Sequence, residues 1–528
     1  MASPSLQNFE VASPLPQPFL PLRSFATELL DRLNRFGCKP CFVTAHGEEI
    51  SYADVARRSI SVAVHLRRIG VRPEQKICLL AETGPQFAWT LLGCLLHSTT
   101  VVLACSYRHA ISIVDKHGPS AFLFGQSVVP PHRDNVRGCQ NTKYVLLESI
   151  DCVSESPLVD YISPPYRGSI VTPSLVVYSG GSGGTQRGVI LPDKWLHYLL
   201  FLQDHGGNKS LLEHKDDVLL LTVPLWRSPG IIILITALVA GCTMIVQQTF
   251  EPEESFRLIE KFRISGLPLL AKMTSDMASH GSLAKYDLSS VRFVLSFSGP
   301  ICSKAWQTLH RHMDIEYIRQ VYSLTECLVS TRRRRHAELM NLGPPLPGMR
   351  VKIVQLENNE KSSLKVPGMI WVDGECMFLG YLGGETQRKV ADSKGWFSTG
   401  DIGYYDERGN IHVLDRTLDT FLCQGTRITP VELEDTLRHH PAVKMAVVVG
   451  VPVARAGEAA RAFIVPIARP EDAHSEGESI RAFIRLRCPF AKQLHGGVEF
   501  VRKLPLTEVG RPIRRILKER YLTTRQNE

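Results

Sequence analysis

A glycine-rich segment in the first half of the chain carries residue types that bind phosphate. Residues 178–189 read YSGGSGGTQRGV and follow an apolar stretch. Because glycine has no Cβ, backbone N–H groups and serine hydroxyls in such a run can close around an anion, and Arg187 adds a permanent positive charge. The spacing does not fit a Walker A loop. Composition alone leaves two interpretations open, a phosphate cradle and a flexible surface loop.

Two later segments carry groups that suit a nucleoside. Asp401 lies in residues 395–403, GWFSTGDIG, and its acceptor-only carboxylate can bind both hydroxyls of a ribose. Tyr322 lies in residues 320–326, QVYSLTE, and offers a flat ring to a base. The structural alternatives are a turn aspartate after glycine and a core tyrosine.

The elements around these segments alternate in a regular way. Short apolar runs such as residues 76–80 alternate with helical patterns such as residues 52–69, which predicts parallel sheets with crossover helices. Residues 368–414 carry short strands with glycine-bearing turns and predict a small antiparallel subdomain. Beyond them, residues 430–439 predict a helix and residues 442–450 an apolar strand.

Bulk composition predicts a folded protein, and the sequence predicts neither a nucleic-acid partner nor a transmembrane segment. The chain has 528 residues, 44% hydrophobic and 21% charged, with a net charge of +9 that is spread along its length. The arginine run 332–335 suits either an anion patch or a solvated face, and no nucleic-acid-binding motif accompanies it. The longest apolar stretch, residues 231–246, is shorter than a membrane span and contains Gly241, so a buried helix followed by a strand is expected.

The cysteines and the chain ends predict a cytoplasmic location. The 13 cysteines are dispersed and mostly flanked by apolar residues, as expected in a reducing compartment. The N-terminal residues lack a signal-peptide pattern, and the last residues do not form the Ser-Lys-Leu peroxisomal signal.

Five ordered motifs resemble those of the adenylate-forming (AMP-binding) enzymes, which include acyl-CoA synthetases, 4-coumarate-CoA ligases and luciferases. The glycine-rich segment resembles their YSSGTTGxPKGV signature. The other matching segments are residues 320–326 (QVYSLTE), 343–348 (GPPLPG), 395–403 (GWFSTGDIG) followed by Asp415-Arg416, and 504–515 (LPLTEVGRPIRR). The resemblance extends from about residue 40 to about residue 518.

Together with the residue patterns, the resemblance implies an α/β fold in two parts. We expect a loose leader over residues 1–25 and an N-terminal AMP-binding domain over residues 26–416. That domain would hold two αβαβα-type subdomains and a small β subdomain. A small mobile α+β C-terminal domain is expected over residues 417–528.

The resemblance also implies a reaction and a set of site residues. ATP would activate a small-molecule carboxylic acid to an acyl-adenylate with release of pyrophosphate, and transfer to CoA would follow. The implied catalytic residues are Arg511, Thr325, Glu326 and Arg187, with Glu326 also binding Mg²⁺. The implied ATP-binding residues are Ser179, Gly180, Gly181, Ser182, Gly183, Gly184, Ser298, Gly299, Pro300, Tyr322, Asp401 and Arg416. Arg227 and Phe297 would line the acyl pocket.

Several positions depart from the family pattern. Arg511 and Arg187 stand where the family has lysines, Leu418 stands where it has lysine or aspartate, and Leu422 replaces a lysine associated with thioester formation. Arg227 occupies the position of a pocket histidine and indicates either an acidic substrate or a buried ion pair.

Two alternative functions therefore stay open. One is a weak or inactive relative that binds ATP, acyl-adenylate or a protein partner. The other is an adenylating enzyme whose acceptor is a carrier protein, an amine or an oxygen instead of CoA. The sequence does not predict the acid or the oligomeric state.

Overall fold

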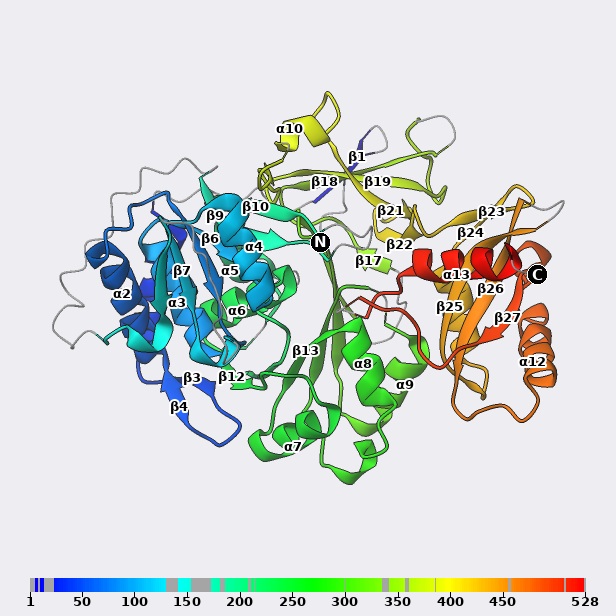
Figure 1. Ribbon diagram of the computed structural model, residues 1–528, viewed down its shortest axis with the longest axis horizontal. Coiled ribbons are helices and arrows are strands. Elements are labelled where there is room, and N and C mark those ends of the chain that lie inside the picture. Colours follow the sequence, from blue (N-terminus) through cyan, green and yellow to red (C-terminus); the bar gives the residue numbers. More distant parts are fainter. Residues whose placement is uncertain are drawn as a thin grey trace.

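The strands of the protein form separate sheets that are joined by helices (Figure 1). The structure is a computed structural model. It describes residues 5–7, 10–13, 23–129, 141–152, 172–180, 186–207, 210–212, 214–299, 301–334, 341–356, 360–384, 386–453, 457–507 and 510–526.

The first sheet carries the glycine-rich segment at one of its strand ends. Its central strands are parallel, and β10 is antiparallel to both of its neighbours. In spatial order its strands are β20 (Gly380–Tyr381), β10 (Gly188–Pro192), β9 (Pro173–Tyr178), β6 (Thr100–Leu103), β5 (Lys76–Leu80), β7 (Ala121–Phe124) and β8 (Lys143–Leu146).

The second sheet is also parallel through its centre. The edge pairs β15–β16 and β3–β4 are antiparallel. Its strands in order are β16 (Leu328–Arg334), β15 (Tyr317–Ser323), β14 (Phe293–Phe297), β13 (Gly266–Leu270), β11 (Val218–Leu221), β12 (Thr243–Val246), β3 (Pro40–Val43) and β4 (Glu49–Ser51). Ligands in such open sheets bind beyond the carboxyl ends of the strands, so those ends are where the site is expected.

Helices fill the space between these two sheets. The largest buried cluster joins apolar side chains of both sheets with those of α1, α2, α3, α5 and α6. α2 begins with a capping box between Ser51 and Asp54, and α6 ends where Gly241 adopts a positive φ. The helices are α1 (Phe25–Phe36), α2 (Tyr52–Arg68), α3 (Pro85–Leu96), α4 (Tyr107–His117), α5 (Asp193–His205), α6 (Ser228–Ala240), α7 (Pro252–Phe262), α8 (Ala271–Ala278), α9 (Ser303–His312), α10 (Gln387–Val390), α11 (Pro430–Arg438), α12 (Ala473–Arg485) and α13 (Arg514–Gln526).

The predicted antiparallel subdomain is present as a third sheet. Its strands in order are β1 (Ser5–Gln7), β2 (Glu10–Ala12), β18 (Met349–Val354), β19 (Gly368–Gly374), β21 (Phe397–Tyr405), β22 (Ile411–Arg416) and β17 (Asn341–Gly343). A loose leader was expected over residues 1–25. The structure differs at residues 10–12, because β2 pairs with β18 and Val11 is completely buried. A three-residue strand is too short to give a periodic signal in the sequence.

The last part of the chain forms its own sheet at one end of the molecule (Figure 1). β25 (Val443–Val453) and β26 (Gly457–Pro466) form a long antiparallel pair, while β27 (Gly497–Phe500) runs parallel to β26. β23 (Phe421–Cys423) and β24 (Thr426–Ile428) complete the sheet. α11, α12 and α13 pack on it, so this region has the predicted α+β composition.

The apolar stretch of residues 231–246 forms α6 and then β12, as predicted, and both are buried. In the ranges that the structure describes, no helix combines the length and the apolar character needed to cross a bilayer. The cytoplasmic location stays a prediction.

Candidate active site

Two side chains, those of Tyr322 and Arg416, contact the carboxylate of Asp401. Asp401 in β21 lies directly opposite Arg416 in β22, and Arg416 Nε is 3.2 Å from Asp401 Oδ1. Tyr322, near the carboxyl end of β15, donates its hydroxyl to Asp401 Oδ2 at 2.8 Å. We call Tyr322, Asp401 and Arg416 the Asp401 corner.

The surroundings of Tyr322 in the Asp401 corner keep its hydroxyl protonated. Burial, reinforced by the charge of Asp401, raises the pKa of Tyr322 well above its ordinary value, so the phenol stays a donor. Asp401 is only 6% exposed, and each of its oxygens accepts one bond from these partners. A carboxylate has about four acceptor positions, so two positions remain for ligand hydroxyls.

The glycine-rich segment connects two antiparallel strands, β9 and β10. Ser179 N donates to Arg187 O at 2.9 Å, and Arg187 N donates to Ser179 Oγ at 3.2 Å, which closes the base of the loop. Gly180 continues from this base. Gly181, Ser182, Gly183 and Gly184 were predicted to bind ATP, but they lie outside the described residues.

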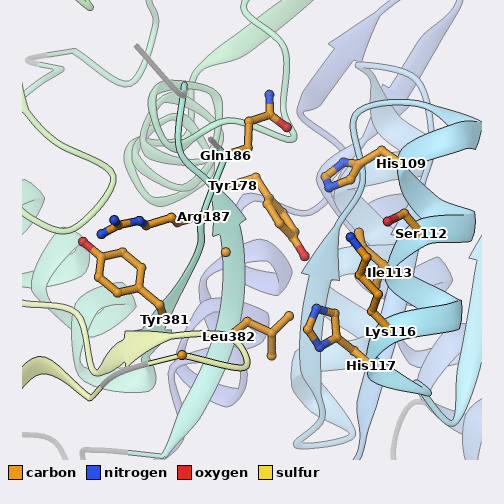
Figure 2. Close-up of a pocket in the computed structure, with 12 residues that line it drawn as sticks. His109, Ser112, Ile113, Lys116, His117, Tyr178, Gln186, Arg187, Tyr381 and Leu382 are labelled. Carbon is orange, nitrogen blue, oxygen red and sulfur yellow. The ribbon is translucent and has the colours of Figure 1, made fainter. Parts of the chain in front are cut away.

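Tyr381 connects Arg187 with Glu326, which lies in the motif of residues 320–326. No sequence motif indicated this tyrosine. Its guanidinium lies 5.1 Å from the ring centroid of Tyr381, and Tyr381 donates its hydroxyl to Glu326 Oε1 at 3.0 Å. Figure 2 shows Arg187 and Tyr381 close together on one side of β10, whereas Tyr178 points to the other side, toward α4. Tyr381 lies in β20, which pairs with β10, so its role follows from sheet order and not from any motif.

Glu326 is a half-buried carboxylate whose surroundings shift its pKa. Burial raises its pKa, while the hydrogen bond from Tyr381 and the charges of Arg416 and Arg187 act in the opposite direction. Within the described ranges, no three metal-ligating side chains gather at one point. A magnesium ion held here would therefore take Glu326 as its protein carboxylate and complete its shell with phosphate oxygens and water, which is the usual arrangement for this ion. Thr325, the preceding residue, lies in the turn between β15 and β16.

The last of the five motifs, residues 504–515, contacts the turn that follows β14 of the second sheet. We call these residues the closing motif. We call the described part of this segment, residues 504–507 and 510–513, the arm. Arg511 Nε donates to Ser298 O at 3.1 Å, which joins the arm to the turn after β14. Arg511 N donates to Thr507 Oγ1 at 3.1 Å, and Gly510 at φ +77° packs against the Lys272 side chain. A Cβ at Gly510 would fall 2.3 Å from the nearest Lys272 carbon, so the arm needs glycine there.

Arg511 lies close to the Asp401 corner. Burial is the main cause that lowers its pKa, and the charge of Arg416 acts in the same direction, while Asp401 and Asp419 oppose both. Ser298 and Gly299 both have positive φ, at +68° and +148°, which turns the chain sharply beyond β14. Pro300 lies outside the described residues. Phe297, the last residue of β14, is fully buried.

Arg227 lies beside the base of the glycine-rich segment. It is 7% exposed, and its guanidinium lies 4.3 Å from the Trp226 ring centroid. Its Nη1 atom is 3.6 Å from the position that a Cβ would take on Gly180, at the base of the glycine-rich segment. The structure therefore places the predicted acyl-pocket residue Arg227 next to the predicted phosphate-binding segment.

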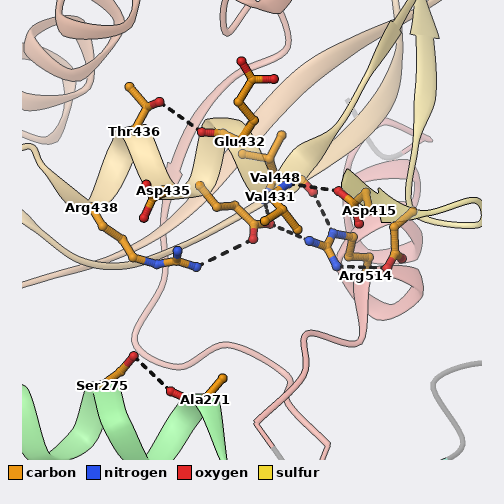
Figure 3. Close-up of polar contacts among 12 residues, drawn as sticks. Ala271, Ser275, Asp415, Val431, Glu432, Asp435, Thr436, Arg438, Val448 and Arg514 are labelled. Atoms are coloured by element: carbon orange, nitrogen blue, oxygen red, sulfur yellow. Dashed lines mark hydrogen bonds and ion pairs between the residues drawn. The ribbon is translucent and has the colours of Figure 1, made fainter. Parts of the chain in front are cut away.

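An arginine of the closing motif anchors the C-terminal sheet (Figure 3). Arg514 donates to Glu434 Oε1 at 2.8 Å, to Asp419 Oδ2 at 3.2 Å and to Val448 O at 3.2 Å. Asp415 accepts from Val431 N at 3.0 Å, and burial raises its pKa to about 7 although the charge of Arg514 opposes this. The sequence analysis assigned no role to these groups.

The two leucines that replace family residues lie near this anchor and are accessible. Leu418 is 88% exposed and Leu422 is 49% exposed. Neither side chain is needed to fill a core.

A pocket of about 520 Å³ adjoins the far side of β10 (Figure 2). Its lining combines α4 residues with the end of the glycine-rich segment, including His109, Lys116, His117, Tyr178 and Gln186. It therefore borders the site and does not enclose the Asp401 corner.

Two family models match successive parts of the chain. A model described as AMP-binding enzyme matches residues 29–382, and a model described as AMP-binding enzyme C-terminal domain matches residues 432–511.

The curated relatives cover nearly the whole chain. A 4-coumarate-CoA ligase of Humulus lupulus, CCL1, is 26% identical over 524 residues and aligns with 96% of this chain and 94% of its own length. A 4-coumarate-CoA ligase of Vanilla planifolia is 28% identical over 530 residues, with 95% of this chain and 93% of its own length covered.

Solved structures share the fold. ATP-bound MatB from Rhodopseudomonas palustris superposes with a TM-score of 0.79 at 22% identity, covering 94% of this chain and 98% of that one. A benzoate CoA ligase from Burkholderia xenovorans LB400 gives 0.78 at 20% identity, covering 94% and 100%. The motifs, the fold and these matches agree, and the chain belongs to the AMP-binding enzyme family of adenylate-forming enzymes.

Proposed function

We propose that this protein uses ATP to activate a carboxylic acid as its acyl-adenylate, with release of pyrophosphate. The observation that carries the proposal is the meeting of Tyr322, Asp401 and Arg416 at one buried carboxylate, with Arg511 of the arm beside it. These residues come from two sheets and the closing segment. A structural ion pair alone would not require the tyrosine, the arm and the turn at Ser298 to converge there.

Each group has a defined task in the proposed reaction. The free acceptor positions of Asp401 bind the ribose hydroxyls and so fix the nucleotide. A carboxylate oxygen of the acid then forms a bond to the α-phosphorus while the bond to the pyrophosphate oxygen breaks. Arg511 and Arg187 stabilise the negative charge on either side of the reacting phosphorus, which is how most of the rate is gained in such reactions. When bound, Mg²⁺ would neutralise phosphate charge beside Glu326.

The proposed second half is transfer of the acyl group to CoA. The support comes from the relatives, which are described as CoA ligases and align over nearly their full length. The C-terminal domain, proposed over residues 417–528, would move between the two half-reactions.

A second candidate is adenylation with an acceptor other than CoA. The observation that favours it is the exposure of Leu418 and Leu422, because a solvent-facing leucine does not supply the charge of the family residue that it replaces. An ordinary lysine at either position would remain hydrated and charged.

The decisive experiment measures pyrophosphate release from the purified chain with ATP and a panel of aliphatic and aromatic acids. Acid-dependent release supports adenylation, and absence of release from every acid, with ATP binding intact, contradicts it. Adding CoA and assaying the thioester by mass spectrometry then separates the two acceptors. Asp401→Ala serves as the control with weakened ATP binding.

A further inference from the structure

Among the described residues, the segment that begins α9 supplies no capping side chain of its own. Its N-cap residue, Cys302, makes no side-chain hydrogen bond to the first turn of the helix. The first N–H groups of a helix have no partner within it, and they carry the positive end of the helix dipole. An aspartate satisfies such groups well, because its carboxylate accepts from the backbone and has the opposite charge.

Asp435 of α11 supplies this carboxylate from another part of the chain. Its Oδ1 atom accepts from Ser303 N at 3.3 Å, and its Oδ2 atom accepts from Ser303 Oγ at 3.0 Å. In return, Lys304 Nζ donates to Arg438 O at 3.3 Å, at the C-terminal end of α11. α9 packs against the second sheet, whereas α11 packs on the C-terminal sheet. Each helix therefore supplies a polar partner to the end of the other, across the boundary between two sheets.

The helix that carries Asp435 is also tied to the start of α13. Glu434 Oε1 accepts from Arg514 Nη2 at 2.8 Å and from Val448 N at 2.9 Å, which joins α11 to the C-terminal sheet and to α13 (Figure 3). Arg511, in the arm, comes shortly before Arg514 in the chain. The position of α11 on α9 therefore affects the position of Arg511.

The arm and α11 contact neighbouring parts of one segment of the chain. Arg511 Nε donates to Ser298 O, in the turn after β14. Asp435 binds Ser303, which follows that turn at the start of α9. Two separated contacts restrict rotation of the C-terminal sheet more than the contact of the arm alone.

We propose that Asp435 is a positioning residue that holds Arg511 at the proposed active site. The inference rests on the proposed function for its effect on the rate. Asp435 acts by fixing the C-terminal sheet on α9, and not by touching ATP or the acid. Removal of its carboxylate should therefore slow the step that uses Arg511 and leave nucleotide binding at the Asp401 corner intact.

The first test measures pyrophosphate release by Asp435→Ala with the acid that gives the highest rate in the wild type. We expect kcat to fall by about 5-fold, the size of effect that loss of a helix N-cap produces. The Kd for ATP, measured by calorimetry, should stay unchanged. Asp435→Asn should keep part of the rate, because its amide oxygen still accepts hydrogen bonds. An unchanged kcat in Asp435→Ala, or an equal loss of ATP affinity, would overturn the inference.

A double-mutant comparison tests whether the effect passes through Arg511. In the Arg511→Ala background, Asp435→Ala should cause no further loss of kcat, because residues that act through one interaction are not additive. Losses that multiply would show that Asp435 acts independently of Arg511 and would reject the inference.

A matched control is available in the same region of the chain. Asp472 caps α12 within its own segment, where it accepts from His474 N at 2.9 Å. Asp472→Ala removes a helix-capping carboxylate of the same kind and should leave kcat unchanged. A loss equal to that of Asp435→Ala would indicate general destabilisation of this region and contradict a specific role for Asp435.

Hydrogen exchange separates this inference from the proposed function, because it needs no substrate. Asp435→Ala should speed amide exchange in the arm as well as at the start of α9, and Asp472→Ala should speed it in neither. If no acid releases pyrophosphate while exchange in the arm still rises, the proposed function fails and the positioning of the arm by Asp435 stands. Faster exchange at α9 alone would show that Asp435 is only a local cap and would reject the inference.

Discussion

The Asp401 corner and the arm hold their arginines in different ways. Arg416 lies in a hydrogen-bonded sheet and forms an ion pair with Asp401 at 3.2 Å. Arg511 lies in a loop, and within the described residues its side chain is joined to the rest of the site by a hydrogen bond to a backbone carbonyl, Ser298 O. Under the proposed function, we expect the sheet to bind the nucleotide and Arg511 of the arm to act on the reacting groups. Binding and rate should therefore depend on different residues, and four predictions test this division.

The largest effect is expected at the arm. Arg511→Ala should lower kcat for pyrophosphate release by about 10²–10³-fold, the usual loss when one donor to a developing charge is removed. The Kd for ATP, measured by calorimetry, should stay near the wild-type value because the Asp401 corner is intact. The kcat of Arg511→Lys should lie between those of wild type and Arg511→Ala, because an ammonium cannot bond Ser298 O and the reacting anion with the planar geometry of a guanidinium. If the lysine variant is faster than wild type, the arginine at position 511 lowers the rate relative to the lysine of the family.

The Asp401 corner should show the opposite pattern. Asp401→Ala is expected to weaken ATP binding by about 100-fold, because it removes the hydroxyl acceptor and leaves Arg416 and Tyr322 without their shared partner. The control is Asp373→Ala, which removes a carboxylate from β19 of the same sheet that pairs with Arg350. Unchanged ATP affinity in Asp401→Ala would reject the assignment of this corner to the nucleotide.

A further effect, on stability and not on activity, is expected at Asp415 in β22, which accepts a hydrogen bond from Val431 N in α11. The folded-state pKa of Asp415, about 7, lies above its ordinary 3.8, so folding favours the protonated carboxyl. The resulting stabilisation is complete below about pH 4 and is lost as the pH rises through about 7. Asp415→Asn should remove this dependence on pH. Urea unfolding at several pH values measures it, and parallel curves for the two proteins would contradict the assignment.

The smallest effect is expected at Tyr381. Tyr381→Phe removes the hydrogen bond to Glu326 and should change the magnesium dependence of the rate by a few-fold, since one such bond is worth about 1 kcal/mol. Tyr178→Phe is the matched control, because Tyr178 lies on the other side of β10 (Figure 2). Equal shifts in both variants would mean that Glu326 does not depend on Tyr381.

Much of this site could be predicted from local sequence. The glycine-rich segment, Asp401 and Arg416 lie in ordered motifs, and the patterns around residues 52–69 and 231–246 predicted α2, α6 and β12. These features are local, because a helical period or a glycine run needs no distant partner to be recognised. The roles proposed for the site residues stay predictions until ligands are measured.

The tertiary structure alone decided which side chains meet. The contact of Tyr381 with Glu326 follows from the pairing of β20 with β10, and the bond from Arg511 to Ser298 joins residues more than two hundred positions apart. Residues far apart in the sequence are also joined where Arg514 bonds Glu434 and Asp419 and where β2 pairs with β18. The chain by itself determined the residue types and the elements, because those depend on neighbours in sequence. Distances between elements depend on how sheets order their strands and how buried side chains pack, and no local pattern carries that information.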